Sequence, residues 1–156
     1  MQKIFFIFAK NKLKKMRIIH FSDFHLDKSN LTQSNNIVYH LENTLKLINQ
    51  EKNIDLILFT GDMINQGGQN FPTVEEAFKT FKIVFINRLC NAINLPLSRF
   101  IFTIGNHDIR RDYDNQATEY GLKYMLKDLN SVSKIIDNED SDDSVKRILP
   151  FKNFEQ

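Results

Sequence analysis

The sequence has little cysteine, and this excludes disulfide bonding within the chain. Its 156 residues include one cysteine, Cys90, which has no partner for an intramolecular disulfide. Cys90 lies in a helix-like stretch with apolar neighbours and beside no group that would lower its pKa. We therefore interpret it as a small core residue rather than a nucleophile. A single thiol permits a reducing compartment, and we expect a cytoplasmic protein.

Long apolar runs are also missing. The apolar stretch at residues 4–9 is shorter than the core of a secretory signal peptide, which has about 7 to 15 residues, and a lysine cluster follows it instead of a cleavage site. A membrane-spanning helix would need about 20 apolar residues. We expect residues 1–15 to be a leader or an upstream start-site extension. A short extra strand is the alternative.

No strong excess of charge marks a partner. The chain carries 21 Lys and Arg against 19 Asp and Glu, a net charge of +2, and 42% of its residues are hydrophobic, as in an ordinary soluble domain. Neither nucleic acid nor a membrane surface is indicated. The Gly-rich loops that cradle phosphates in nucleotide-binding modules are absent too, which argues against a plain nucleotide-binding α/β domain.

Three short apolar runs alternate with two helical patterns. The runs at residues 17–21, 54–59 and 100–104 predict buried strands, and the middle one is apolar enough to be a central strand covered on both faces. A helix is expected near residues 35–49, with Ser34 or Asn35 as its N-cap. The order predicts an α/β fold in which parallel strands are joined by helices.

The second helix has the clearer start. Thr73 followed three residues later by Glu76 is a capping-box pattern, and Pro96 lies just beyond the expected end. One face of this helix is predicted to be apolar: Val74, Ala77, Phe78, Phe81, Phe85 and Leu89. Further along, we expect a helix at residues 117–129, a solvated acidic loop or linker at 137–143 and a short strand at 147–151.

Polar motifs follow each predicted strand. Asp23 and His25 come after the first strand, Asp62 after the second, and Asn106 with its two neighbours, His107 and Asp108, after the third. The carboxyl ends of parallel strands meet at one edge of a sheet, so these side chains are expected to share one site. Asp23 and His25 are two residues apart and would point to the same side of an extended chain.

Carboxylate, imidazole and amide groups are ligands for divalent metals. This mixture of oxygen and nitrogen suits Mn, Fe, Zn or Co better than Ca or Mg. Two ions at such a site can activate a water and neutralise the charge of a phosphate, so hydrolysis of phosphoesters is the expected reaction class.

The three motifs resemble, in this order, the opening motifs of the calcineurin-like metallophosphoesterases: Asp-x-His, Gly-Asp, and Gly-Asn-His followed by Asp or Glu. The resemblance implies the β-α-β-α-β front half of an αββα sandwich and a dinuclear metal site. It implies that Asp23, His25, Asp62 and Asn106 bind metal. It also implies that His107 donates a proton to the leaving oxygen and that Asp108 fixes the tautomer of His107.

The same resemblance predicts an incomplete site. Members of that family add histidines from the second half of the domain, whereas this chain has histidines only at positions 20, 25, 40 and 107. The first ion would lack one imidazole and the second ion two. We therefore expect residues 16–130 to be the N-terminal portion of a longer phosphoesterase, with residues 131–156 as an acidic linker and truncated tail. An exposed apolar sheet face would favour association.

Two functional alternatives remain open from the sequence. The chain hydrolyses a phosphomonoester or phosphodiester, or it is a non-catalytic remnant that binds metal or phosphate or needs a partner chain to complete the site. Among the remaining polar residues, we expect His20 to support the site or the core and His40 to lie on a helix surface. Arg110 and Arg111 could offer charge to a phosphate, but we expect solvated loop arginines.

Overall fold

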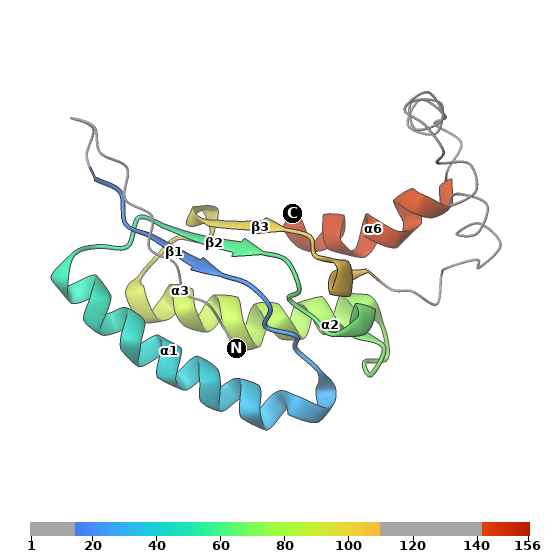
Figure 1. Ribbon diagram of the computed structural model, residues 1–156, viewed down its shortest axis with the longest axis horizontal. Coiled ribbons are helices and arrows are strands. Elements are labelled where there is room, and N and C mark those ends of the chain that lie inside the picture. Colours follow the sequence, from blue (N-terminus) through green and yellow to red (C-terminus); the bar gives the residue numbers. More distant parts are fainter. Residues whose placement is uncertain (1–14, 110–141) are drawn as a thin grey trace, which may run out of the picture.

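The computed structural model describes residues 15–109 and 142–156, and a three-stranded parallel sheet lies at its centre. The strands are β1 (Ile18–Phe21), β2 (Leu56–Thr60) and β3 (Phe100–Thr103), and β2 is the middle strand (Figure 1). Ile57 of β2 pairs with Ile19 of β1 and with Phe100 of β3. The predicted α/β class and the β-α-β-α-β order are confirmed.

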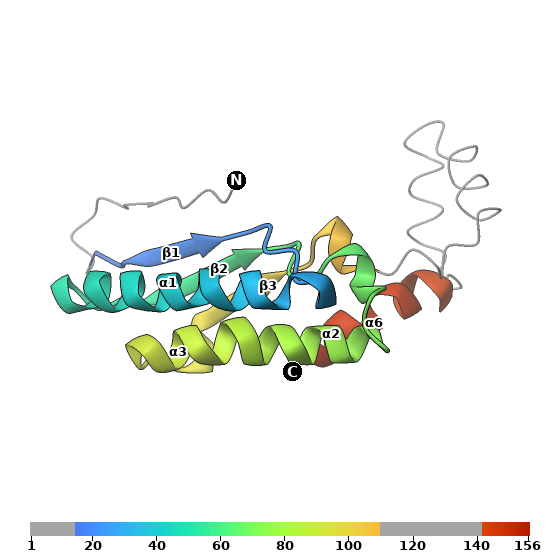
Figure 2. The ribbon, with the colours of Figure 1, turned by 90° about the horizontal axis from the view of Figure 1, so that it is seen from below.

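The connections between the strands are helical. Helix α1 (Leu31–Glu51) joins β1 to β2, and α2 (Val74–Phe81) and α3 (Arg88–Ile93) join β2 to β3. A π-helical segment, Lys82–Asn87, links α2 to α3 without a break. Figure 2 places α1 and the α2–α3 helix on the same side of the sheet. Because the strands follow one another in the order β1, β2, β3 across the sheet, two right-handed crossovers place both helices on one face.

The two helix starts differ from each other. Thr73 is the N-cap of α2, and its hydroxyl accepts the Glu76 backbone N–H at 3.1 Å, as predicted, although the reciprocal bond of the capping box does not form within the described part of the chain. The prediction for α1 is wrong in its details. The helix begins four residues before residue 35, because a 3-10 turn at Lys28–Asn30, capped by Asp27, starts the winding earlier.

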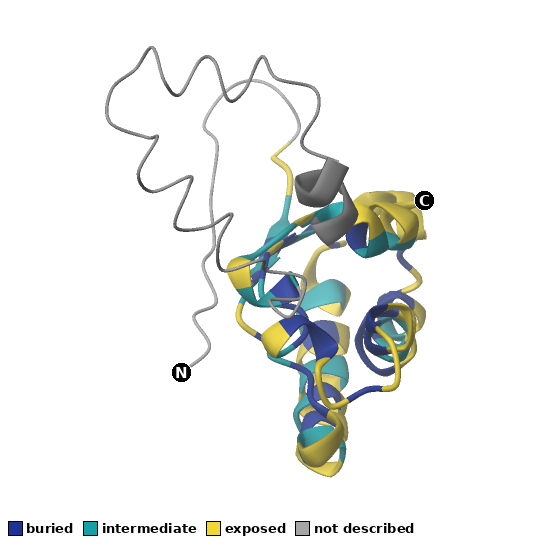
Figure 3. Cartoon of the chain, turned by 90° about the vertical axis from the view of Figure 1, so that its right-hand side faces the viewer, coloured by how far each residue is buried: buried dark blue, intermediate teal, exposed yellow. Residues whose placement is uncertain are grey.

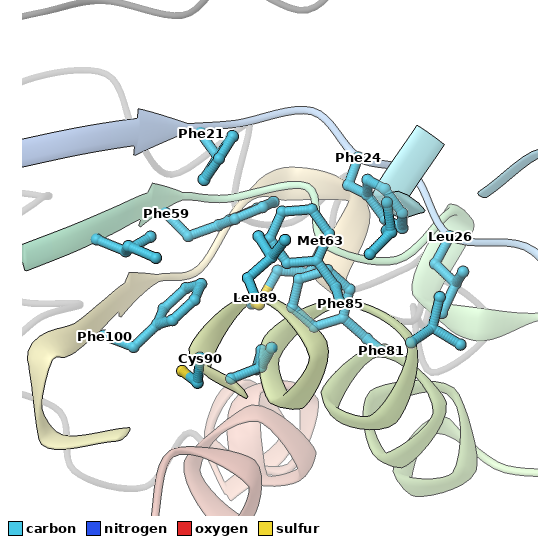
Figure 4. Packing of buried hydrophobic residues seen from close by; sticks show 14 of the residues in the cluster. Phe21, Phe24, Leu26, Phe59, Met63, Phe81, Phe85, Leu89, Cys90 and Phe100 are labelled. Carbon is cyan, nitrogen blue, oxygen red and sulfur yellow. The ribbon is translucent and has the colours of Figure 1, made fainter. Parts of the chain in front are cut away.

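Phenylalanine side chains fill the space between the sheet and the helices (Figure 4). The Phe85 ring lies 5.4 Å from the rings of both Phe21 and Phe59, and 5.1 Å from Phe81, against which it stacks. The whole predicted face of the second helix is buried. Cys90 is buried as well, and burial raises the pKa of its thiol, which confirms the core interpretation.

The other face of the sheet is less well covered by the described residues (Figure 3). Side chains in β1 and β2 alternate between buried and half-buried, and Ile101 of β3 is 47% exposed. The prediction that β2 is covered on both faces is therefore wrong for this part of the chain. The partly exposed apolar face agrees with the predicted exposed sheet face, and association through it stays a prediction.

The C-terminal segment is a helix, not a strand. Helix α6 (Asp142–Glu155) replaces the strand predicted at 147–151, because Phe151 and Phe154, three residues apart, reach the same neighbour, Phe78 of α2. Residues 142 and 143, which were predicted to belong to the acidic loop, form the start of this helix. The predicted helix at 117–129 and the rest of the acidic stretch lie outside the described residues. None of the described helices is long and apolar enough to span a membrane.

Candidate metal centre

Three loops leave the sheet at the same edge, where β1, β2 and β3 end (Figure 1). They bring His25, Asp62 and His107 together. Each of these residues offers one ligand atom, and the three atoms lie within 4.8 Å of one another. The rings of His25 and His107 are 4.6 Å apart and nearly perpendicular. Two residues predicted to bind metal thus lie beside the residue predicted to transfer a proton.

The backbone of this edge is not extended. Asp23, His25 and Asp62 have positive φ angles of 58°, 50° and 58°, in the left-handed region that residues other than glycine adopt at a cost. The prediction that Asp23 and His25 share one side of an extended chain is wrong, because the loop turns sharply at both residues. Their side chains still approach each other, with His25 Nε2 3.9 Å from Asp23 Oδ1.

Backbone hydrogen bonds continue the pairing of β1 and β2 into the loops. The N–H of Asp23 donates to the carbonyl of Gly61 at 3.2 Å, and that of His25 donates to the carbonyl of Asp62 at 3.0 Å. This pairing holds the His25 ring near the Asp62 carboxylate, with 3.9 Å between His25 Nε2 and Asp62 Oδ2. The carboxylate of Asp62 is mostly shielded, whereas that of Asp23 is 61% exposed.

Asp62 and Asp108 tie the loops after β2 and β3 to each other. Asp62 Oδ1 accepts the backbone N–H of His107 at 2.9 Å. In return, Asp108 Oδ2 accepts the N–H groups of Asp62 at 2.9 Å and Gly105 at 2.8 Å, and its Oδ1 accepts that of Ile64 at 3.0 Å. Each carboxylate therefore satisfies backbone donors of the other loop.

The described residues show no hydrogen bond between Asp108 and the His107 ring, and the role of Asp108 in fixing the tautomer of His107 stays a prediction. Both oxygens of Asp108 accept backbone N–H groups, the residue is buried, and His107 Nδ1 has no hydrogen-bond partner among the residues that the structure describes. Burial raises the pKa of Asp108 above its usual value, although the surrounding backbone N–H groups act to lower it. The geometry makes Asp108 a connector of loops, and a direct catalytic role for it stays a prediction.

Gly61 and Gly105 allow these two loops to touch. A Cβ atom on Gly105 would lie 2.3 Å from both the backbone nitrogen and Oδ1 of Asp62, and one on Gly61 would lie 2.7 Å from the Gly105 Cα. Any larger residue would push the loops apart. The glycines in the Gly-Asp and Gly-Asn-His-Asp motifs thus have a physical reason, which is the close approach that brings Asp62 next to His107.

The site fits a divalent cation. His25 Nδ1 and His107 Nδ1 are buried and lack a hydrogen-bond partner in the described part of the chain, which is unusual for buried polar atoms. Within the described residues, no Lys or Arg side chain pairs with the carboxylates of Asp23 or Asp62. Imidazole nitrogen and carboxylate oxygen are the ligands that Zn, Mn, Fe and Co accept.

The other polar residues singled out in the sequence lie at different distances from this cluster or outside the described residues. Asn106 begins the 3-10 turn that carries His107 and is exposed, and its role as a ligand stays a prediction. His20 Nε2 in β1 lies 2.6 Å from the Thr60 hydroxyl, at the end of β2 and beside the site. His40 is exposed on α1, as predicted. Arg110 and Arg111 lie outside the described residues.

Sequence reasoning missed a buried polar network behind His25. The Asp27 carboxylate accepts bonds from the backbone and hydroxyl of Ser29, and from the amide groups of Asn65 at 3.4 Å and Asn70 at 2.8 Å. Burial acts to raise the pKa of Asp27, but these hydrogen bonds outweigh it and hold the pKa below its usual value. Asp27 followed two residues later by Ser29 is a turn-and-cap pattern that would have indicated this role.

Comparisons with known proteins agree with this geometry. A family model described as calcineurin-like phosphoesterase matches residues 16–153. The chain is also similar to the sphingomyelinase phosphodiesterase D of Dictyostelium discoideum, with 29% identity over 82 residues. That alignment includes 53% of this chain and 17% of the Dictyostelium protein, so the chain matches a small part of that relative. No solved structure gives a significant match. The family match includes most of the chain and every motif of the site, and the chain belongs to the calcineurin-like phosphoesterase family.

Proposed function

We propose that the chain binds divalent metal at the carboxyl edge of its sheet and hydrolyses a phosphoester there. The observation that carries the proposal is the cluster of His25, Asp62 and His107, whose ligand atoms lie within 4.8 Å of one another at the ends of three parallel strands. Family membership and the similarity to a phosphodiesterase support a phosphoesterase function in general terms. Metal dependence and turnover by this chain are the proposed steps.

Asp23, His25, Asp62 and Asn106 would hold the metal, of which we propose two ions of the Mn, Fe, Zn or Co class. The metal supplies an activated water and neutralises negative charge on the phosphoryl group. The two oxygens of Asp62 have different tasks. Oδ1 accepts the backbone N–H of His107, so Oδ2, which lies 3.9 Å from His25 Nε2, is the oxygen left for an ion.

His107 is proposed to donate a proton to the leaving oxygen. Its main chain is fixed by the bond to Asp62, and its ring lies against that of His25. A half-buried imidazole next to the reacting group is the usual proton donor near neutral pH. His107 also belongs to the ligand cluster, so His107→Asn separates the two roles. A proton donor loses turnover and keeps metal affinity, whereas a ligand loses both.

The test is metal-dependent turnover of bis(p-nitrophenyl) phosphate and of p-nitrophenyl phosphate by the full chain. We expect hydrolysis that requires added Mn²⁺ and is abolished by Asp62→Ala. His40→Ala removes an exposed histidine of α1 and is the control, which should keep full activity. No turnover with any of Mn²⁺, Zn²⁺, Fe²⁺ or Co²⁺, or turnover unchanged by Asp62→Ala, would contradict the proposed enzyme.

A non-catalytic metal-binding or phosphate-binding role is the second candidate. It is favoured by the small size of the cluster. In the described part of the chain, the group of His, Cys, Asp or Glu residues whose ligand atoms all lie within 4.8 Å of one another has three members: His25, Asp62 and His107. The same titration separates the candidates. Mn²⁺ binding that depends on Asp62, without turnover of either ester, would support this role or a site completed by a partner chain.

A further inference from the structure

We infer that Asn30 is a positioning residue for the metal centre, because its side chain holds His25 in a strained backbone conformation. The hydrogen bonds of the Asn30 side chain within the described residues do not reach the side chains of His25, Asp62 or His107. Its amide group instead donates a hydrogen bond to the backbone carbonyl of His25 at 3.0 Å. The consequence for metal binding rests on the proposed function, whereas the hydrogen bond from Asn30 to His25 does not.

His25 needs such a contact because of its backbone angle. A φ of 50° is unfavourable for a residue with a β-carbon, and it persists only where surrounding bonds fix it. Two bonds do so here. The N–H of His25 donates to the carbonyl of Asp62 at 3.0 Å, and the carbonyl of His25 accepts from Asn30. If the second bond is lost, the pairing with Asp62 is the remaining hydrogen bond of the His25 backbone among the described residues.

The other end of the Asn30 side chain is anchored to rigid structure. Asn30 Oδ1 accepts the backbone N–H of Asp27 at 2.9 Å and the hydroxyl of Ser34, a buried residue of α1, at 3.0 Å. Asn30 therefore connects the His25 carbonyl to the first turn of a 21-residue helix. Asp27 in turn holds Asn70 in the loop after β2, at 2.8 Å.

Helix capping accounts for one end of the Asn30 side chain but not for the other. Asn30 Oδ1 accepts the Asp27 N–H as part of the capping box of the 3-10 turn Lys28–Asn30. The amide donor to the His25 carbonyl has no part in that capping box. Asn30 occupies the N-cap position of α1, where an Asn side chain usually accepts a backbone N–H from the first turn. The Asn30 side chain makes no such bond. It faces the loop that carries His25, and both of its polar atoms are bonded to groups on or beside that loop.

The chain provides a matched control in Asn49, near the other end of α1. Its amide also links the helix to two backbone groups, because it donates to the carbonyl of Ile93 at 3.4 Å and accepts the N–H of Ile54 at 2.7 Å. Ile54 precedes β2, so Asn49 lies at the edge of the sheet opposite the metal centre. Asn49→Ala removes a comparable link without touching His25.

Two variants of Asn30 separate the donor from the acceptor. Asn30→Ala removes both. Asn30→Asp keeps an oxygen for the N–H of Asp27 and the hydroxyl of Ser34, but a carboxylate has no hydrogen to donate to the His25 carbonyl. If the donor is what positions His25, both variants release it, even though Asn30→Asp adds a negative charge that would otherwise attract a cation.

The experiment combines amide hydrogen exchange in the metal-free full chain with Mn²⁺ affinity measured by electron paramagnetic resonance. In both Asn30 variants, exchange of the His25 amide should be faster by about tenfold or more. Mn²⁺ should bind about 10- to 100-fold more weakly, the usual effect of removing a group that orients a ligand. Asn49→Ala should lower the unfolding midpoint and leave both quantities at their wild-type values.

Unchanged exchange at His25 in Asn30→Asp would overturn the inference. So would an equal effect of Asn49→Ala on exchange or affinity, because this would indicate a general loss of stability. If the wild-type chain bound no Mn²⁺, the proposed function would fail, while the exchange of His25 in the metal-free protein would still decide the role of Asn30.

Discussion

The side of the sheet that faces the helices and the edge where the strands end are built in opposite ways. The helix-facing side is an apolar layer in which aromatic rings meet edge to face, as Phe85 does with Phe21 and Phe59. The edge consists of loops in which several residues have positive φ angles, and it contains two buried carboxylates, Asp27 and Asp108. Non-directional packing stabilises the first region, whereas directed hydrogen bonds to the backbone define the second.

This difference predicts different responses to substitution. A buried aromatic ring contributes to the stability of the whole molecule, so its loss should lower the free energy of unfolding without changing the affinity of the folded protein for metal. A residue of the strand-end edge contributes less to stability but fixes the ligands. Its loss should weaken metal binding by more than the lost stability explains. The following substitutions test that separation.

The largest loss of stability is expected from Phe85→Ala. The Phe85 ring is 1% exposed and packs against rings from the sheet and from its own helix, so truncation leaves a cavity that should cost about 3–5 kcal/mol. Urea unfolding measures the loss, and Phe85→Leu should cost less. Mn²⁺ affinity, measured where the variant is folded, should stay at its wild-type value. A large loss of affinity would break the proposed separation.

Gly105→Ala should lower both the stability of the protein and its affinity for metal. The φ of Gly105, −109°, suits alanine, so the cost arises from the Cβ atom, which would lie 2.3 Å from Asp62 Oδ1. We expect a loss of about 1–3 kcal/mol from this overlap and a large loss of Mn²⁺ affinity, because Asp62 must move. Thr103→Ala, at an exposed position in β3, is the control. Equal affinity in the two variants would contradict the close contact between the loops.

Asp108→Asn should act through the loops. An amide is similar in shape to a carboxylate but has one acceptor oxygen, so at least one backbone bond to Asp62, Ile64 or Gly105 is lost or replaced by a repulsive contact. We expect a loss of about 1–2 kcal/mol in urea unfolding. Hydrogen exchange at the Ile64 and Asp62 amides should become faster. Unchanged protection at both amides would show that the carboxylate does not hold them.

The smallest effect is expected for the ion pair that joins α1 to α3. The guanidinium nitrogens Nε and Nη2 of Arg88 donate hydrogen bonds to the two carboxylate oxygens of Glu42, at 2.8 and 2.7 Å. These hydrogen bonds hold the pKa of Glu42 below its usual value. A lowered pKa in the folded state stabilises the protein above the ordinary carboxyl pKa and ceases to do so as the pH falls through the folded value.

Glu42→Gln should therefore cost about 0.5–1 kcal/mol near neutral pH, where the ion pair is partly screened by solvent. The difference between the variant and the wild type should be constant above about pH 5 and should disappear in strong acid. Urea unfolding at several pH values measures it, and Mn²⁺ affinity should not change. A difference that grows as the pH falls would contradict the assigned direction.

The sequence predicted the apolar layer better than the edge. Periodic side chains identified the strands and the buried face of the second helix, because burial imposes a repeat that the sequence must follow. Periodicity gave the wrong prediction for residues 147–151, which belong to helix α6 and not to a strand. The apolar residues of this segment resemble a short strand, and only contact with Phe78 of α2, distant in sequence, shows why Phe151 and Phe154 belong to a helix.

At the edge, the sequence identified the residues but not their contacts. The order of the strands was enough to bring His25, Asp62 and His107 together. The left-handed angles of Asp23 and His25, and the backbone bonds of Asp108, depend on how two loops approach each other in space. No local pattern contains that information. The bond from Asn30 to the His25 carbonyl was missed for the same reason, whereas the cap formed by Asp27 and Ser29 has a local sequence pattern.

The most direct test of the metal centre is a Mn²⁺ titration of the isotope-labelled chain followed through its histidine ring signals. A paramagnetic ion broadens nearby nuclei, and the chain has four histidines, at positions 20, 25, 40 and 107. We predict that substoichiometric Mn²⁺ broadens His25 and His107 and leaves His40, which is exposed on α1, sharp. Asp62→Ala should abolish this selectivity. Equal broadening of His40 and His25, or no broadening of His25, would contradict a metal site at the carboxyl edge of the sheet.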